Sequence, residues 1–273
     1  MYYLLTESFK SQEAKLAALI QETMPVEKIY MLGSTLMQQR TESVFMTDAP
    51  SRRNVGHYWL LALVDKDCGH SDSYVQDKIE NNCQHFIPVT VIVLNTQQFN
   101  TWLMEGHRFA CTVMKIAVLL HDSTHIPLVI PNAINEESDK KMTETYCTQG
   151  INKVNEFIAG AELYRLRQQN KMAAFMLHQA AEHALHTIFK KATGLHINTH
   201  NIDKLIRYCA MVNYKIPAIF LRENEADKRL FGLFQKAYID TRYKDDFIIN
   251  AAELLTITEK LKTLQELMQD TEE

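Results

Sequence analysis

The chain has 273 residues, enough for one large or two ordinary domains, and its 29 basic and 33 acidic residues give a formal net charge of −4. Charged residues make up 23% of the chain and hydrophobic residues 46%, which excludes a largely disordered protein. The negative net charge argues against broad nucleic-acid binding, while a local basic patch stays open. No apolar run approaches the ~20 residues of a membrane span.

Cysteine usage and the first residues indicate the compartment. The five cysteines are odd in number and widely spaced, as expected of reduced thiols and not of a disulfide framework. The stretch from Met1 to Lys10 lacks the basic front and the long apolar segment of a signal peptide. We therefore expect a cytoplasmic protein with no membrane partner.

A change in composition divides the chain. Helix and strand patterns alternate in the first part, whereas Pro217 is the only one of the six prolines that follows residue 141. A polar run from Asn132 to Lys141 separates the two parts. We expect an α/β domain over residues 1–131, a linker over 132–141 and a helical bundle domain over 142–273.

The first domain alternates helices with short strands. A helix is expected from Glu7 to Glu22, where it must stop before Pro25. Runs rich in β-branched and aromatic residues indicate the strands of a mixed sheet, and two further segments indicate helices that cover it. The expected strands are Lys28–Leu32, His57–Val64 and Ile87–Leu94, and the expected helices are Ser71–Gln84 and Gln97–Met104.

A glycine and a serine follow the first expected strand. Gly33 lets the backbone come close to a ligand, and Ser34 together with the N–H groups of a following helix would hold a phosphate. The simpler alternative is that Gly33-Ser34 only makes a turn.

This arrangement resembles the minimal nucleotidyltransferases of the DNA polymerase β superfamily. The resemblance rests on Gly33-Ser34 after a strand, on a second strand that ends in Leu-Leu-Ala-Leu-Val-Asp65, and on the closing segments Glu105–Ala110 and Ala117–Asp122. It covers roughly residues 25–125 and implies a nucleotide held with Mg²⁺.

The metal-binding carboxylates of that superfamily are missing. Its chemistry needs two carboxylates one residue apart on the second strand, so that both face Mg²⁺. Here His57 and Trp59 fill those positions, and Thr90 takes the place of the third carboxylate. Asp65 and Asp67 have the right spacing but fall beyond the strand, in an expected solvated loop. We expect an inactive domain; the alternative is an active nucleotidyltransferase that modifies a small molecule, an RNA or a protein partner with other carboxylates.

The second domain shows only helical patterns. Apolar residues recur at helical spacing along stretches without proline, and Gly194 marks a helix stop. The expected helices are Met142–Arg167, Lys171–Ala192, Asn201–Val212, Glu225–Asp240 and Asn250–Gln269. Five helices with short links indicate an all-α bundle.

Polar motifs on these helices carry a second resemblance. Gln179–Glu182 (Gln-Ala-Ala-Glu) lies on the second helix, Thr199–Leu205 starts the third, and Arg242-Tyr243 follows the fourth. In this order and spacing they resemble the HEPN family (higher eukaryotes and prokaryotes nucleotide-binding) over roughly residues 150–270. The resemblance implies a helical bundle that forms a homodimer, with a polar cleft between the partners.

HEPN ribonucleases carry an arginine and, after four to six residues, a catalytic histidine. Counting from Arg242, those positions hold Phe247, Ile248 and Ile249, so we expect no ribonuclease activity. The resemblance then implies a regulatory module that binds a nucleotide, with or without Mg²⁺, or RNA. Because such domains also occur as toxin and antitoxin pairs, it further implies a stress or defence role.

The expected ligand site combines cations with an aromatic ring. Arg242 and Lys244 would hold phosphates, and Tyr243 would stack on a base. His178 and Glu182 would add polar groups from the second helix. The alternatives are that Arg242 pairs with an acidic neighbour (Asp240, Asp245 or Asp246) and that His178 and Glu182 only make contacts between helices.

Histidines crowd the second domain and invite a metal site. Glu182 and His186 are four residues apart on one helix face, as are His196 and His200 if that segment is helical. No His-Glu-x-x-His motif is present, and two ligands do not hold zinc. We expect no metal site and assign no catalytic residue.

Overall fold

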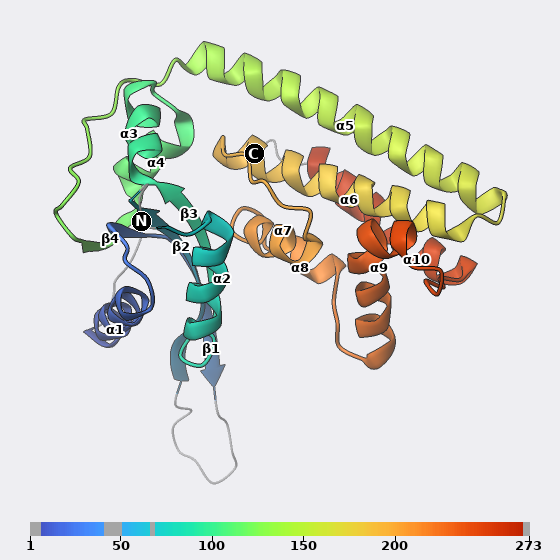
Figure 1. Cartoon of the computed structure of the whole chain (residues 1–273), viewed down its shortest axis with the longest axis horizontal. Helices are drawn as coiled ribbons and strands as arrows, with labels where there is room; N and C mark the ends of the chain where they lie inside the picture. The colour runs from blue at the N-terminus through green and yellow to red at the C-terminus, as the bar shows by residue number, and fades with distance from the viewer. Residues whose placement is uncertain (1–6, 41–50, 66–68, 270–273) are drawn as a thin grey trace, which may run out of the picture. The chain divides into compact units, whose positions relative to one another are not determined.

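The computed structural model describes residues 7–40, 51–65 and 69–269. The chain forms two compact units, Met1–Ile134 and Asn135–Glu273 (Figure 1). Within the described part of the chain, no helix has the length and the apolar character that a membrane crossing needs.

The N-terminal unit is a four-stranded sheet with helices. Its elements are α1 (Glu7–Thr23), β1 (Lys28–Arg40), β2 (Ser51–Val64), α2 (Asp72–Cys83), β3 (Val89–Asn95), α3 (Thr96–Met104), α4 (Arg108–Ile116) and β4 (Val118–Asp122). The strand order is β3-β2-β1-β4, with β1 antiparallel to both of its neighbours and β2 parallel to β3. The expected α/β architecture with a mixed sheet is confirmed.

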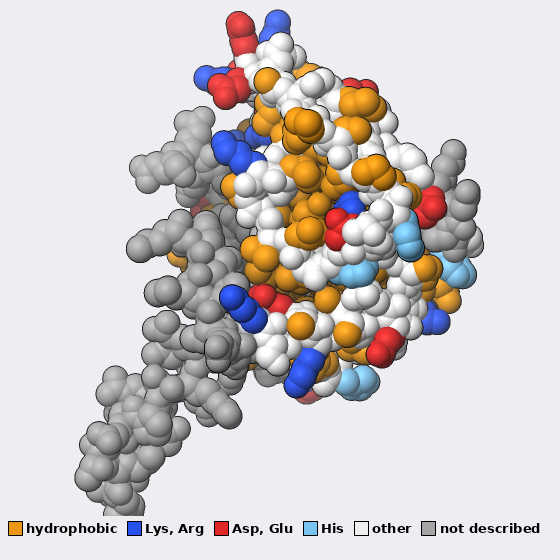
Figure 2. Space-filling model, turned by 90° about the vertical axis from the view of Figure 1, so that its left-hand side faces the viewer, with side chains coloured by type: hydrophobic (Ala, Val, Ile, Leu, Met, Phe, Trp, Pro, Cys, Tyr) orange, Lys and Arg blue, Asp and Glu red, His pale blue; other side chains and the backbone are white. Residues whose placement is uncertain are grey.

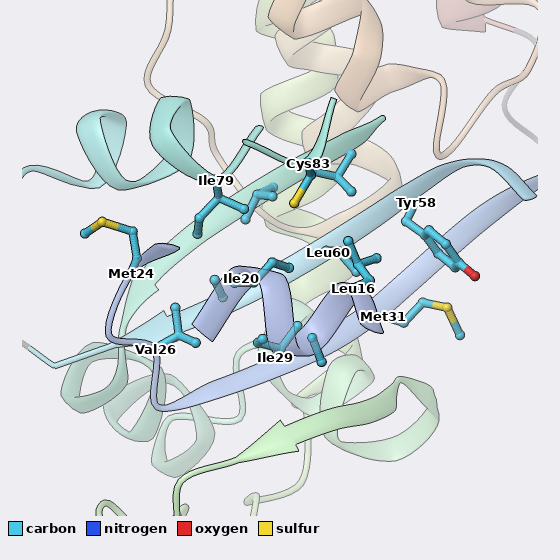
Figure 3. Packing of buried hydrophobic residues seen from close by; sticks show 14 of the residues in the cluster. Leu16, Ile20, Met24, Val26, Ile29, Met31, Tyr58, Leu60, Ile79 and Cys83 are labelled. Carbon is cyan, nitrogen blue, oxygen red and sulfur yellow. The ribbon is translucent and has the colours of Figure 1, made fainter. Parts of the chain in front are cut away.

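One face of this sheet packs against α1 and α2. Leu16 and Ile20 of α1, Ile79 of α2 and Leu60 of β2 belong to a single buried cluster (Figure 3). Burying each of these side chains stabilises the fold by roughly 1.5–3 kcal/mol. Because successive strand residues point to opposite faces, Trp59 lies on the face of β2 away from this cluster.

β1 and β2 form a longer hairpin than the sequence predicts. β1 continues through Gly33 and Ser34 and pairs with β2 as far as Arg40 and Ser51, with a register shift between Met31 and Gly33. The prediction that Gly33-Ser34 joins a strand to a helix is therefore wrong. The glycine accompanies a bulge within a strand, and no helix begins there to offer N–H groups to a phosphate.

The C-terminal unit is helical, as expected. Its elements are α5 (Glu136–Leu166), α6 (Asn170–Thr193), α7 (Ile202–Cys209), α8 (Ile216–Ile219), α9 (Glu225–Tyr243) and α10 (Ala251–Gln269). α6 is the central helix and packs against α5, α7, α9 and α10. It ends at Gly194, whose φ of 81° suits a glycine C-cap.

Four helices of this unit differ from expectation, and one of them, α7, ends at Cys209 and not at Val212. α5 begins at Glu136 because the Asn135 side chain caps it, so residues 136–141 of the expected linker are helical. α9 continues past Asp240 to Tyr243. α8 has four residues, too few to show a helical period in the sequence.

Candidate functional site

The centre of the candidate site is a histidine and a glutamate one turn apart on α6. His178 is fully buried, and its Nδ1 lies 3.9 Å from Glu182 Oε2. Among the described residues, neither ring nitrogen of His178 has a hydrogen-bond partner. Burial first, and the charges of His200 and Arg242 next, lower the pKa of His178 to about 4. The ring is therefore neutral at pH 7 and adds no charge to the site.

Glu182 also binds the segment that precedes α7. Its Oε1 lies 2.9 Å from His200 Nδ1, and its Oε2 accepts a hydrogen bond of 3.3 Å from Gln179 Nε2. The His200 ring stacks on Tyr238 of α9, with 4.8 Å between the ring centroids and 14° between the planes. These contacts join α6, the α6–α7 connection and α9. The residue after His200, Asn201, is the N-cap of α7.

Arg242 lies in the last turn of α9 with its guanidinium among aromatic rings. Its Nε donates a hydrogen bond of 2.8 Å to the Tyr238 carbonyl oxygen, and its Cζ is 4.2 Å from the centre of the Tyr238 ring. The rings of Tyr243 and Phe175 lie at 5.3 and 5.8 Å. Within the described ranges, no carboxylate lies within ion-pair distance of Arg242. Its charge therefore remains available to an anion.

The two neighbours of Arg242 differ in their availability. Tyr243 ends α9 and is 76% exposed, so a face of its ring can meet a ligand. Lys244 leaves the helix, and its Nζ pairs with Asp240 at 3.0 Å. Asp240, one of the acidic residues that were possible ion-pair partners of Arg242, therefore pairs with Lys244 instead.

A surface pocket of about 410 Å³ lies where the α5–α6 connection meets the segment after α9. Its lining residues are Gln168, Gln169, Asn170, Lys171, Met172, Phe247, Ile248 and Ile249. Pockets that hold small ligands typically have about 300–1,000 Å³. The pocket is large enough for a nucleobase.

In the N-terminal unit, the three side chains at the positions expected for metal-binding carboxylates lie together. Trp59 of β2 pairs with Thr90 of β3, and His57 Nε2 is 3.0 Å from Thr90 Oγ1. The rings of His57 and Trp59 are 4.8 Å apart. Asp65 follows the end of β2 and accepts a hydrogen bond from Gln97, while Asp67 lies outside the described residues. This face of the sheet offers imidazole, indole and hydroxyl groups where Mg²⁺ prefers carboxylate oxygens.

Metal ligands do not cluster elsewhere in the described ranges, where no three His, Cys, Asp or Glu side chains form a group that could hold an ion. His186 and His196 are neighbours, with 5.2 Å between ring centroids, and His186 Nε2 lies 3.1 Å from the Thr199 carbonyl oxygen. Burial first, and His196 next, lower the pKa of His186 to about 4.

Two aromatic residues of the site were not among the expected site residues. Tyr238 and Phe175 both contact the Arg242 guanidinium. Tyr238 is four residues before Arg242 on one helix, a spacing that places both on one face and could have indicated the contact. Phe175 comes from another helix, and no local pattern links it to Arg242.

Comparison with known proteins supports the reading of the second unit. No curated protein matches the chain. No nucleotidyltransferase family matches the N-terminal unit. The family model of the HEPN domain matches residues 141–273, from the first turns of α5 to the end of the chain. The C-terminal unit therefore contains a HEPN domain, a helical module related to nucleotides and RNA.

Proposed function

We propose that the HEPN domain binds a nucleotide, free or within an RNA chain, and that the protein acts by binding and not by cutting RNA. The observation that carries this proposal is the environment of the Arg242 side chain. Its guanidinium stacks on Tyr238, has no carboxylate partner among the described residues, and lies beside the exposed ring of Tyr243. A guanidinium fork suits a phosphate, and an exposed aromatic ring suits a base.

The residues after Arg242 support a role without cleavage. Two of the three positions at which a ribonuclease would carry its histidine hold Phe247 and Ile249, which are 5% and 4% exposed. The third, Ile248, is 74% exposed but apolar. None of these three side chains accepts or donates a proton, so no general acid or base stands at the positions where a ribonuclease carries its histidine.

The charge of the molecule favours a small ligand over a long duplex. The net charge of the chain is −4. Figure 2 shows the side on which the N-terminal unit lies, and there the described Lys and Arg side chains are scattered among apolar and acidic side chains without a broad basic patch. Duplex binding needs many phosphate contacts at once. The Arg242 guanidinium has the geometry to bind one phosphate group.

The N-terminal unit is proposed to be a nucleotidyltransferase-like domain without transfer activity. His57, Trp59 and Thr90 stand together where that superfamily holds its metal with carboxylates. Without anionic oxygens to hold Mg²⁺ against a triphosphate, the charge of the transferred group is not offset.

The HEPN domain is also proposed to form a homodimer. Exposed apolar side chains near the end of α9 and on α10 support an interface: Ile239 and Leu255 are 56% and 45% exposed. Burying these side chains against a second copy would remove apolar area from water.

Nucleotide titration of the wild type, Arg242→Ala and Arg229→Ala tests the proposal. Arg229 is the matched control, because it lies on the same helix but already pairs with Glu253. A charge-assisted phosphate contact contributes roughly 1.5–3 kcal/mol, so Arg242→Ala should weaken binding about ten- to hundredfold. Arg229→Ala should leave the affinity unchanged. Equal affinities of all three proteins, or a loss only in Ser34→Ala, would place the ligand elsewhere.

A further inference from the structure

The pocket at the start of α6 is lined by side-chain amides. Gln168 and Gln169 stand on the α5–α6 connection and Asn170 opens α6, while Phe247 and Ile249 form a buried apolar floor. An amide carries both donor and acceptor groups, and this combination matches the edge of a nucleobase. An apolar floor suits the flat face of a base.

Two of these amides are available to a ligand. Asn170 Nδ2 donates a hydrogen bond of 3.0 Å to the Ile249 carbonyl oxygen, which ties the two walls of the pocket together. The side chains of Gln168 and Gln169 make no hydrogen bond to any described residue. The Asn170 amide therefore joins the two walls of the pocket, and the amides of Gln168 and Gln169 can bind a ligand.

The pocket lies beside the Arg242 guanidinium. Lys171 Nζ, at the pocket wall, donates hydrogen bonds to the carbonyl oxygens of Lys244 and Asp245, at 3.2 and 2.6 Å. Phe175 lies one turn after Lys171 on the same face of α6, and its ring is 5.8 Å from Arg242 Cζ. One helical turn is about 5.4 Å. Lys171 at the pocket wall and Phe175 beside Arg242 are therefore one helical turn apart on α6, so the pocket and the guanidinium are neighbours.

We propose that this amide-lined pocket binds the base edge of the nucleotide whose phosphate is held by Arg242, and so makes the site selective among nucleobases. This inference rests on the proposed function. Arg242 and Tyr243 recognise a phosphate and the face of any base, whereas only hydrogen bonds to the base edge distinguish one base from another. The same chemistry is offered by a free mononucleotide and by one nucleotide of an RNA strand.

The backbone of Gln168 allows a clean test. Its φ is 59°, in the left-handed region that non-glycine residues rarely adopt. Gln168→Gly removes the amide and relieves this strain, so the variant should fold at least as well as the wild type. Gln169→Ala removes the second amide from a residue whose φ is −90°.

The experiment is a calorimetric titration of the full chain with AMP, GMP, CMP, UMP and ribose 5-phosphate. The wild type should prefer one base over the weakest by at least about tenfold. Gln168→Gly should weaken the preferred nucleotide by about three- to tenfold and leave ribose 5-phosphate unchanged. Gln169→Ala should act in the same direction.

Tyr243→Ala and Arg242→Ala serve as comparisons in the same titrations. Tyr243→Ala should weaken all four nucleotides alike, and Arg242→Ala should weaken ribose 5-phosphate as well. Single-stranded tetranucleotides of each base separate the two sources: an RNA ligand should bind at least about tenfold tighter than its mononucleotide, and a free nucleotide should not.

Equal binding of all four bases by the wild type would overturn the inference and leave the proposed function standing. The same conclusion would follow if Gln168→Gly and Gln169→Ala kept the full base preference. If the wild type bound none of the nucleotides or tetranucleotides, the proposed function would fail and the inference with it.

Discussion

The close approach of α5 to α6 at Gly150 predicts a clear effect for Gly150→Ala. A Cβ at Gly150 of α5 would lie 2.1 Å from Oγ1 and 2.8 Å from Cγ2 of Thr187 on α6. Thr187 is 4% exposed, and its hydroxyl donates a hydrogen bond of 2.7 Å to the His183 carbonyl oxygen, so its side chain has little room to turn. Overpacking of this kind costs about 1–3 kcal/mol, and loss of the hydrogen bond adds about 1 kcal/mol.

Helix propensity acts in the opposite direction. Alanine is favoured over glycine inside a helix by up to about 1 kcal/mol, so Gly150→Ala should destabilise the protein by about 1–3 kcal/mol in total. Gly160→Ala on the same helix is the matched control, because its Cβ would meet only Met176 at 3.7 and 3.8 Å. That variant should be stabilised by about 0.5–1 kcal/mol.

Urea denaturation followed by far-ultraviolet circular dichroism measures both variants. Gly150→Ala/Thr187→Ala removes the two nearest atoms of Thr187 and should be more stable than the sum of the single changes predicts. If Gly150→Ala were as stable as Gly160→Ala, α5 and α6 would not approach as closely as described, and the argument would be refuted.

Three further results are expected. Burial lowers the pKa of His178 to about 4, so its contribution to stability is complete above about pH 6.5 and is lost as the pH falls toward 4, with a loss of about 2 kcal/mol at pH 5. Glu182, His200 and Arg242 face the His178 ring. His178→Leu should flatten this pH dependence in urea titrations. Sedimentation velocity at micromolar concentration should show a dimer that Ile239→Glu dissociates, and a wild type that sediments only as a 31.6 kDa monomer would remove the dimer proposal. Labelled ATP or CTP with Mg²⁺ should transfer no label to RNA or to the protein; transfer that His57→Ala abolishes would show an active nucleotidyltransferase.

Much of the fold can be predicted because proline and glycine residues that end helices stand at the ends of the elements. Pro25 limits α1 and Gly194 ends α6, and both helices agree with the sequence to within a residue or two. The outer part of the β1–β2 hairpin could not be predicted in this way. Gln38, Gln39 and Arg40 are polar, so they show no alternation, and only their pairing with β2 makes them a strand.

The candidate site, too, can be predicted from the sequence only in part. His178 and Glu182 are visible as a motif on one predicted helix, and Arg242 is visible shortly after another, because these motifs are local in the sequence. The hydrogen bond between His200 and Glu182 joins residues 18 positions apart, and the stacking of His200 on Tyr238 joins the α6–α7 connection to α9. Such contacts depend on how the helices pack, which local periodicity does not describe.

A crystal structure of the full chain with a bound mononucleotide tests the central claim most directly. The account predicts a phosphate oxygen within about 3 Å of the Arg242 guanidinium nitrogens, the geometry of a charge-assisted hydrogen bond. A phosphate bound instead at Gly33 and Ser34 of β1, with Arg242 still stacked on Tyr238 and touching no ligand, would contradict it.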